Sequence, residues 1–192
     1  MSEIGVVAID NPKKDKVYGT IGKPIKGVNI QLIDKNNKFI KKNNKIGEMV
    51  VKTPAIFNGY IEKNSSIIRR NFIGNYFKTG DLAKKINKNL IFIDRSKDII
   101  IKGGVNISPQ EIDDCLKKNI FVKESKSVGI KDKFLGEKIK SYVVLNTKKN
   151  ISKQNLIEFC RKKIGNLRSP SEIEFLSNLP KTASGKVIKR YL

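Results

Sequence analysis

The first half of the chain alternates apolar and polar residues over short stretches that polar turns separate. Residues 28–34 read Val-Asn-Ile-Gln-Leu-Ile-Asp, residues 46–53 contain a Met-Val-Val run and end before a proline, and residues 90–94 follow an Asn-Lys-Asn turn. A period of two, bounded by such turns, is typical of short strands. We therefore predict a strand in each of these three stretches.

The second half mixes strands with helices. Residues 98–102 form a β-branched run that stops at Gly103-Gly104, and residues 126–130 and 138–145 are further apolar stretches of strand length. Such runs, bounded by glycine or by charged residues, favour strands. We predict a strand in each of these three stretches, with one helix between the first and the second.

Two helices are predicted from start and stop signals. Ser108-Pro109-Gln110-Glu111 has the residue types of a capping box with proline in the first turn, and Ser152 opens a second helix that ends at Gly165. Helical spacing predicts a buried face on each helix, made of Ile112, Cys115 and Leu116 on the first and of Leu156, Phe159, Cys160 and Ile164 on the second.

This order of elements predicts an α+β fold. A strand, helix, strand, strand, helix, strand series over the second half suits a compact domain of about 100 residues. The β-rich first half differs from it, and the pattern changes between residues 94 and 98. We expect a domain boundary there.

Composition excludes several kinds of chemistry. The chain has 192 residues and no histidine, which removes a histidine general base and the usual histidine-containing zinc sites. Cys115 and Cys160 lie far apart without Cys-x-x-Cys spacing, so neither a disulfide framework nor a structural metal site is expected. Apolar runs are much shorter than the roughly 18 residues that a membrane span requires. We expect a soluble, cytoplasmic protein.

The high positive charge does not by itself indicate a polyanion partner. The net charge is +22, but 34 of the 40 basic residues are lysine, and the chain also holds 29 isoleucines and 19 asparagines, whose codons are rich in A and T. Nucleic-acid binders usually gather basic and aromatic residues on one face, whereas here residues 1–94 carry +10 and residues 95–192 carry +12. A solvated lysine-rich surface is favoured over a nucleic-acid site.

Four motifs carry the candidate chemistry. They occur in residues 76–81 (Tyr-Phe-Lys-Thr-Gly-Asp), 94–107 (Asp-Arg-Ser-Lys-Asp through Gly-Gly-Val-Asn-Ile), 128–137 (Val-Gly-Ile-Lys-Asp through Gly-Glu) and 179–186 (Leu-Pro-Lys-Thr-Ala-Ser-Gly-Lys). Their order and spacing resemble the adenylate-forming enzymes, the superfamily of acyl-CoA synthetases, peptide-synthetase adenylation domains and luciferases. The segment after Arg95 is most similar to the acyl-CoA synthetases, because the Arg-Ile-Glu-Leu-Gly-Glu of peptide synthetases is absent.

The resemblance implies a reaction in two halves. A carboxylate, here expected to be a fatty acid, attacks the α-phosphate of ATP and gives an acyl-adenylate and pyrophosphate. The small C-terminal domain then rotates, and the thiol of CoA displaces AMP. ATP, Mg²⁺ and CoA are the implied cofactors and substrates. An aryl-acid or peptide-synthetase-type adenylating domain is the alternative enzyme, and a non-catalytic basic module that binds nucleic acid or CoA is the alternative outside enzymology.

The resemblance places nucleotide contacts in the first half of the chain. Asp81 is expected after a tight turn, where its two oxygens could accept hydrogen bonds from the ribose hydroxyls. Arg95 offers a fixed fork of donors toward ribose or phosphate. Glu3 matches the acidic residue of the family's Tyr-Gly-x-Thr-Glu motif and is the candidate Mg²⁺ ligand. In isolation, Asp81 and Arg95 would be read as turn and surface residues.

The remaining site residues fall in the second half. Lys97 matches the family's hinge position, and Gly103 and Gly104 match the turn that lines the tunnel for the pantetheine arm of CoA, although two glycines at a strand end are equally typical of an ordinary turn. Lys186 matches the lysine that neutralises charge between the carboxylate and the α-phosphate. Its segment is not a Walker A loop, because Pro180 and Val187 replace the required glycine and Ser or Thr.

The implied organisation is an incomplete first domain and a complete second one. Residues 1–94 match the β-rich end of the AMP-binding domain, truncated at its N-terminus, and residues 95–192 match the mobile C-terminal domain. The family's phosphate loop lies upstream of both, so the chain alone is expected to be inactive. A separate polypeptide that carries the upstream half is one candidate partner. Initiation at an internal methionine, a split gene and a truncated sequence all remain open.

Overall fold

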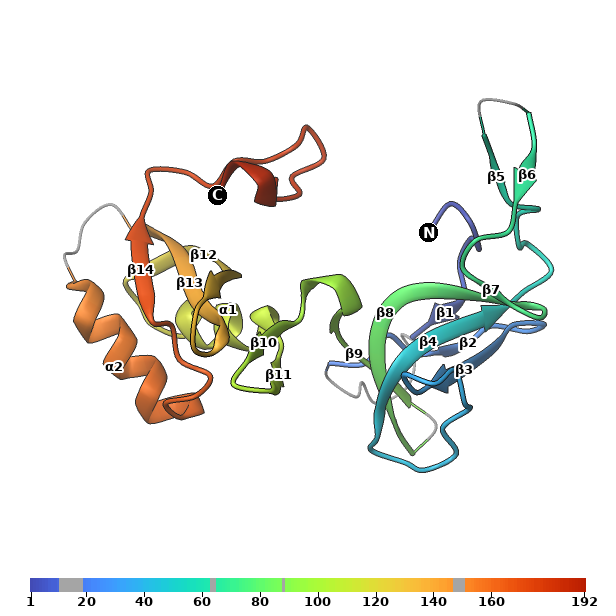
Figure 1. Cartoon of the computed structure of the whole chain (residues 1–192), viewed down its shortest axis with the longest axis horizontal. Coiled ribbons are helices and arrows are strands. Elements are labelled where there is room, and N and C mark those ends of the chain that lie inside the picture. The colour runs from blue at the N-terminus through green and yellow to red at the C-terminus, as the bar shows by residue number, and fades with distance from the viewer. Residues whose placement is uncertain (11–18, 63–64, 88, 147–150) are drawn as a thin grey trace. The chain divides into compact units, whose positions relative to one another are not determined.

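Two compact units make up the chain. The computed structural model describes residues 1–10, 19–62, 65–87, 89–146 and 151–192. Contacts within these ranges divide the protein into Met1–Lys97 and Asp98–Leu192 (Figure 1). The described part of the first unit contains strands and a short 3-10 turn at its end, whereas the second unit combines strands with two α-helices. The α+β class predicted from the sequence is confirmed.

The first unit is built around a five-stranded antiparallel sheet. Its strand order is β3-β4-β8-β7, and β9 pairs with β8. The described strands of this unit are β1 (Ala8–Ile9), β2 (Lys23–Pro24), β3 (Asn29–Ile33), β4 (Ile46–Lys52), β5 (Tyr60–Ile61), β6 (Ile67–Ile68), β7 (Phe72–Ile73), β8 (Tyr76–Ile86) and β9 (Asn89–Arg95). The core on this sheet is formed by Ile4, Ile30, Leu32, Met49, Val51, Phe77, Ala83 and Leu90.

The three strands predicted in this half are confirmed as β3, β4 and β9. Strand β8 was not predicted, although it is the longest strand of the unit, with 11 residues. The strand could not be recognised from the sequence, because Gly80 interrupts the alternation of apolar and polar residues and two lysines follow near its end. The pairing of β8 with three neighbours, β4, β7 and β9, stabilises it in spite of that sequence.

The second unit places two helices against another five-stranded sheet. Its order is β11-β10-β13-β12, and β14 pairs in parallel with β13. The described elements are a 3-10 turn over Ser96–Asp98 at the junction with the first unit, β10 (Ile100–Lys102), β11 (Val105–Ile107), α1 (Pro109–Lys117), β12 (Val122–Asp132), β13 (Gly136–Leu145), α2 (Lys153–Ile164), β14 (Glu172–Phe175) and a 3-10 turn over Lys189–Tyr191.

The central strand β13 separates two apolar layers. Ile139 and Val143 pack with the buried residues of α1 and α2. Tyr142 and Val144, on the opposite face, pack with Leu179 of the C-terminal segment. The alternation of side chains along a strand produces this division. The C-terminal segment is therefore held on the face of the sheet that the helices leave open.

The helices begin where they were expected, but only one of the two caps forms as expected. Ser152 Oγ accepts a hydrogen bond from Asn155 N at 3.1 Å. The side chain of Ser108 makes no capping hydrogen bond to α1, and Glu111 instead lies 3.6 Å from Arg168 as an ion pair. The predicted capping box is therefore wrong, because Glu111 is drawn to a cation elsewhere in the unit. The predicted buried faces of both helices are confirmed.

Candidate active site

Asp81 lies within strand β8 rather than after a tight turn, which corrects the sequence expectation. Glu48 of β4 pairs with Leu82 and Val50 pairs with Lys78, so residues 79–81 bulge opposite Met49. Gly80 adopts a φ of +71°, which glycine accommodates without strain. A β-bulge of this kind redirects the side chains next to it.

Thr79 fixes the bulge from inside the sheet. Its buried hydroxyl donates to the carbonyl of Met49 at 2.8 Å and accepts from the N–H of Asp81 at 3.1 Å. The geometry of the bulge thus accounts for each residue of the Thr-Gly-Asp sequence. Threonine supplies the internal bond, glycine takes the left-handed conformation, and the aspartate is presented beside them.

The pairing of β8 with β9 brings Asp81 opposite Arg95. Arg95 Nε lies 2.7 Å from Asp81 Oδ1, and the side chains are 42% and 14% exposed. This contact is an ion pair without hydrogen-bond alignment, so Oδ1 makes no hydrogen bond with the described residues. Burial raises the pKa of the Asp81 carboxyl, and the nearby Arg95 guanidinium opposes that rise. The two residues therefore present a carboxylate and a guanidinium side by side on the adjacent strands β8 and β9.

Glu3 sits beside an aromatic side chain that the sequence did not indicate. Its backbone carbonyl accepts from Phe57 N at 2.9 Å, and Tyr60 Oη donates to Glu3 Oε1 at 3.2 Å. Burial and the bond to Glu3 raise the pKa of Tyr60. Among the described residues no cluster of three or more acidic or cysteine side chains could hold a metal. A single carboxylate still fits Mg²⁺, which takes most of its ligands from water and from substrate phosphates.

Lys97 is exposed and lies at the junction of the two units. It belongs to the 3-10 turn over Ser96–Asp98, and the first unit ends at this residue. No buried side chain occurs in that turn. A short exposed segment between two compact units is where a change of backbone angles disturbs the least packing.

Gly103 and Gly104 form the two-residue turn of a hairpin that was not predicted as such. Lys102 pairs with Val105, and the glycines between them have φ values of +56° and +76°. Two successive positive φ angles are typical of a type I′ turn. A Cβ added to Gly104 would meet nothing within 4 Å. Turn geometry, rather than crowding inside the unit, therefore accounts for both glycines in this structure.

Lys186 is exposed on a closed loop. The loop is joined at its base by a bridge between Lys181 and Val187 and by a 2.8 Å hydrogen bond from Thr182 N to the carbonyl of Lys186. Thr182 Oγ1 also accepts from Lys186 N at 3.1 Å. The loop is attached to β12 by an ion pair of 2.5 Å between Lys181 and Glu124. The lysine side chain thus projects from an ordered support.

The structure groups the predicted residues by unit. Glu3, Asp81 and Arg95 lie in the first unit, and Gly103, Gly104 and Lys186 lie in the second. The Asp81–Arg95 contact is direct, whereas the sequence had assigned the two residues to separate motifs. Sequence reasoning also missed Tyr60 and Thr182. Only Thr182 left a signal, because it opens a Thr-Ala-Ser-Gly stretch, whose threonine, serine and glycine are common turn residues.

Comparison with known proteins identifies the family. A profile of AMP-binding enzymes matches residues 1–61, and a profile of the AMP-binding enzyme C-terminal domain matches residues 111–186. The chain belongs to the AMP-binding enzymes, the adenylate-forming superfamily, and its second unit contains their C-terminal domain. Glu3 and Lys186 lie inside the matched ranges, whereas Asp81, Arg95 and Lys97 lie between them.

Relatives and solved structures agree with this assignment. The sulfoacetate–CoA ligase of Cupriavidus necator is 32% identical over 97% of this chain and 37% of its own length. The long-chain-fatty-acid–CoA ligase of Bacillus subtilis is 31% identical over 91% of this chain and 31% of its own length. The crystal structure of ATP-bound MatB from Rhodopseudomonas palustris superposes with a TM-score of 0.91 at 26% identity, over 100% of this chain and 38% of that one. The chain therefore spans about a third of the length of these relatives.

Helices of this protein are short. Within the described ranges none is long and apolar enough to cross a membrane.

Proposed function

We propose that this chain supplies the C-terminal part of an AMP-forming acyl-CoA ligase. The observation that carries the proposal is the direct pairing of Asp81 with Arg95 on adjacent strands. A carboxylate with two acceptor oxygens and a guanidinium with several donors suit a ribose and its neighbouring phosphate. Their position on a five-stranded sheet gives them the rigidity that a binding site requires.

In the first half-reaction, an oxygen of the carboxylic acid forms a bond to the α-phosphorus of ATP and pyrophosphate leaves. Lys186 would stabilise the negative charge that the carboxylate and the α-phosphate share. Asp81 and Arg95 would hold the nucleotide in place for that attack. Glu3 would be the protein ligand of Mg²⁺, which supplies charge neutralisation for the phosphates when bound.

In the second half-reaction, the thiol sulfur of CoA forms a bond to the acyl carbon and AMP leaves. Lys97, at the junction of the units, would absorb the rotation of the second unit between the two steps. The turn of Gly103 and Gly104 would then line the path of the pantetheine arm. Its exposed tip, with open space around Gly104, is compatible with a second surface approaching it.

A fatty acid is the acyl substrate that we propose, and CoA is the acceptor. The similarity to a long-chain-fatty-acid–CoA ligase supports the first choice. The match of the Asp-Arg-Ser-Lys-Asp segment to acyl-CoA synthetases supports the second. We also propose that the 192-residue chain does not form an adenylate by itself, because it spans about a third of the length of the CoA ligases that it matches.

A chimera tests the proposal. The matching third of the Bacillus subtilis long-chain-fatty-acid–CoA ligase is replaced by this chain, and the two half-reactions are assayed separately. We expect ATP–pyrophosphate exchange with a fatty acid, and thioester formation from a supplied acyl-adenylate and CoA. The isolated 192-residue chain should catalyse no exchange. A folded chimera that catalyses neither step, together with steep salt-dependent retention of the chain on DNA, would favour a non-catalytic basic module.

Lys186→Ala in that chimera gives the sharpest outcome. Loss of one preorganised charge that acts in a transition state costs about 3 to 4 kcal/mol, so adenylate formation should slow by about a hundred- to a thousandfold. Thioester formation from supplied acyl-adenylate should remain nearly unchanged. Lys163→Ala, which removes an exposed lysine from α2, serves as the matched control. Equal losses in both steps for Lys186→Ala would contradict the assigned role.

A further inference from the structure

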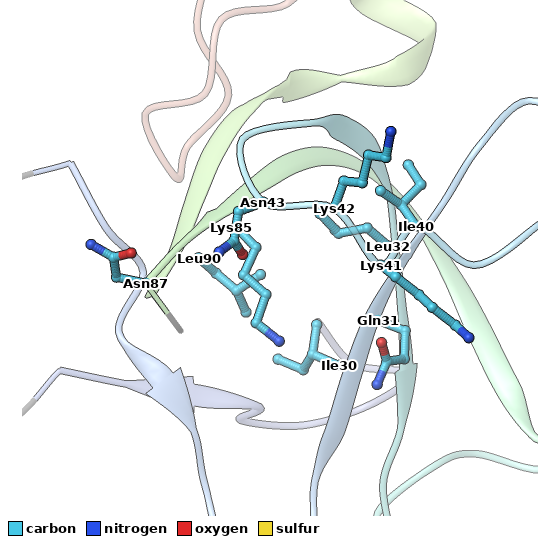
Figure 2. A pocket seen from close by; sticks show the side chains of 10 residues that line it. All are labelled: Ile30, Gln31, Leu32, Ile40, Lys41, Lys42, Asn43, Lys85, Asn87 and Leu90. Atoms are coloured by element: carbon cyan, nitrogen blue, oxygen red, sulfur yellow. The ribbon is translucent and has the colours of Figure 1, made fainter.

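The lysines of this protein differ in whether an acidic residue holds them in place. At a hollow of about 480 Å³ in the first unit, the side chain of Lys85 extends inward, whereas those of Lys41 and Lys42 point away (Figure 2). None of these three forms an ion pair within the part of the chain that the structure describes. Lys189, near the end of the second unit, does form one, because its Nζ lies 2.8 Å from Asp98 Oδ1. This pair joins two segments that are far apart in the sequence.

Asp98 lies where the second unit begins. It ends the 3-10 turn over Ser96–Asp98 and directly follows Lys97, the residue to which we assign the rotation between the two half-reactions. Two positions later, Ile100 is buried in the core that β13 shares with α1 and α2. Asp98 therefore belongs to the second unit and stands next to the residue about which that unit would turn.

Lys189 lies close to the loop that carries Lys186. Only Val187 and Ile188 separate the two lysines, and both belong to the closed base of the loop. Val187 forms the bridge across the base, and Ile188 N donates to the carbonyl of Pro180 at 2.8 Å. Lys189 then begins the 3-10 turn at the end of the chain. A contact that fixes Lys189 therefore also fixes the base from which Lys186 projects.

Polar side-chain contacts attach the C-terminal segment to the rest of the second unit. Among the described residues these contacts are Lys181 with Glu124, Tyr142 Oη with the carbonyl of Leu192, and Lys189 with Asp98. The first two end on strands of the sheet, β12 and β13, whereas Asp98 lies in the junction turn. The side chains of Lys189 and Asp98 are 34% and 20% exposed, so solvent screens their attraction less than that of a pair on the open surface. The Asp98–Lys189 pair is thus the contact that ties the Lys186 loop to the junction.

We propose that Asp98 and Lys189 are positioning residues for Lys186. Their ion pair holds the base of the Lys186 loop at a fixed place relative to the junction, so that rotation of the second unit brings the Lys186 ammonium to one defined position. This inference rests on the proposed function, because it concerns the step in which Lys186 would act. Neither residue of the pair touches a substrate. Loss of the pair should therefore impair adenylate formation through loosened placement of Lys186 and spare thioester formation.

The rates of the two half-reactions in the ligase chimera test this role. Asp98→Asn and Lys189→Gln should each slow adenylate formation by about three- to tenfold, which is less than the effect of Lys186→Ala, because Lys186 keeps its charge and loses only its fixed position. Thioester formation from supplied acyl-adenylate should stay nearly unchanged, whereas a merely destabilised unit would lose both steps. Lys189→Arg keeps the charge and should retain the rate. Arg190→Gln removes a charge from the same 3-10 turn without touching the pair and serves as the matched control.

The double variant shows whether the two residues act together. Asp98→Asn combined with Lys189→Gln should be no slower in adenylate formation than the slower single variant, because both changes remove the same contact. If the effects of the two single variants multiply in the double variant, the residues act separately and the proposal is overturned.

The order of the loop in the 192-residue chain gives a second readout that needs no catalysis. Heteronuclear nuclear Overhauser effects of the backbone amides report motion on the picosecond to nanosecond timescale. Their values at Gly185 and Lys186 should fall in Asp98→Asn and in Lys189→Gln and stay unchanged in Arg190→Gln. Unchanged values in the first two variants would overturn the inference, whatever the rates of the chimera.

Lys186→Ala in the same chimera separates this inference from the proposed function. If Lys186→Ala slows adenylate formation while Asp98→Asn and Lys189→Gln do not, the pair is no positioning device, and the proposed function stands. If Lys186→Ala slows neither step, the proposed role of Lys186 fails, and the inference about its positioning fails with it.

Discussion

A carboxylate paired with a cation occurs in each unit, partly buried in the first and fully buried in the second, and the two pairs differ in what they leave accessible. In the first unit Arg95 Nε lies 2.7 Å from Asp81, and the arginine side chain is 42% exposed. In the second unit Lys126 Nζ lies 3.3 Å from Asp113, and the side chains are 19% and 2% exposed. Burial raises the pKa of both carboxyls. Exposure of the partner cation, rather than the shift in pKa, distinguishes a pair that can meet a ligand from one that cannot.

The two cations suit these different surroundings. Arginine can hold a carboxylate with one nitrogen and direct its other nitrogens outward, whereas lysine carries all three of its donors on one nitrogen, which lies at the buried carboxylate. Asp113 lies on α1 and Lys126 on β12, and the hydroxyl of Ser125 donates to the backbone carbonyl of Asp113 at 3.1 Å. The Asp113–Lys126 pair therefore fastens a helix to a sheet, and the Asp81–Arg95 pair presents two polar groups at a surface.

The largest expected effect concerns Asp113 and pH. Burial raises its pKa from 3.8 to about 6, so between these values the unfolded chain binds fewer protons than the folded one. The contribution of Asp113 to stability should then fall as the pH rises through this window, by about 3 kcal/mol at most. Urea unfolding at a series of pH values, followed by helical circular dichroism, measures the slope, because both described helices lie in the second unit.

Asp113→Asn should remove most of that slope. Asp114→Asn, which changes the exposed neighbour on the same helix, should leave it in place. If both variants keep the slope of the original chain, another group titrates in this window, and the description of Asp113 as the buried member of a closed pair fails.

The next effect concerns Asp81 and catalysis. The AMP moiety is present in both half-reactions, so a residue that holds the ribose should matter in both. Asp81→Asn in the ligase chimera should slow each step by about ten- to a hundredfold, from the loss of hydrogen bonds to a charged group worth about 1.5 to 3 kcal/mol. Asp113→Asn should change neither step. Separate rates for adenylate and thioester formation measure this, and an effect of Asp81→Asn on only one step would contradict a shared nucleotide contact.

Only some of the strands and helices could be predicted from the sequence alone. Strands β3, β4 and β9 and both helices show clear periodicity, so they were predicted. Strand β8 was not, because the Gly80 bulge and the inward-facing Lys85 break the alternation that identifies a strand. The strand predicted over residues 98–102 contains β10, but its hairpin partner β11 was missed, since a strand of three residues is too short to show a period.

The candidate site was predictable as separate residues but not as an arrangement. Motif resemblance selected Asp81 and Arg95, yet only the register of β8 against β9 shows that they touch. Burial of Asp113 and exposure of Arg95 likewise depend on contacts between segments distant in sequence. Such contacts have no local signature in a single sequence, and the capping box at Ser108 failed for the same reason, because Arg168 is the ion-pair partner of Glu111.

The smallest expected effect is the loss of stability when the serine that precedes each helix is replaced. Comparing the two losses shows how α1 is held in place. Ser152→Ala removes the hydrogen bond to Asn155 N, and loss of a serine cap costs about 1 kcal/mol. Ser108→Ala should cost less than half as much, because that side chain makes no capping bond and α1 is fixed by Asp113, Lys126 and its buried face. Urea unfolding at pH 7, followed by helical circular dichroism, gives both values. A larger loss for Ser108→Ala than for Ser152→Ala would show that the start of α1 depends on its cap residue, and the Asp113–Lys126 pair would then not be its main attachment.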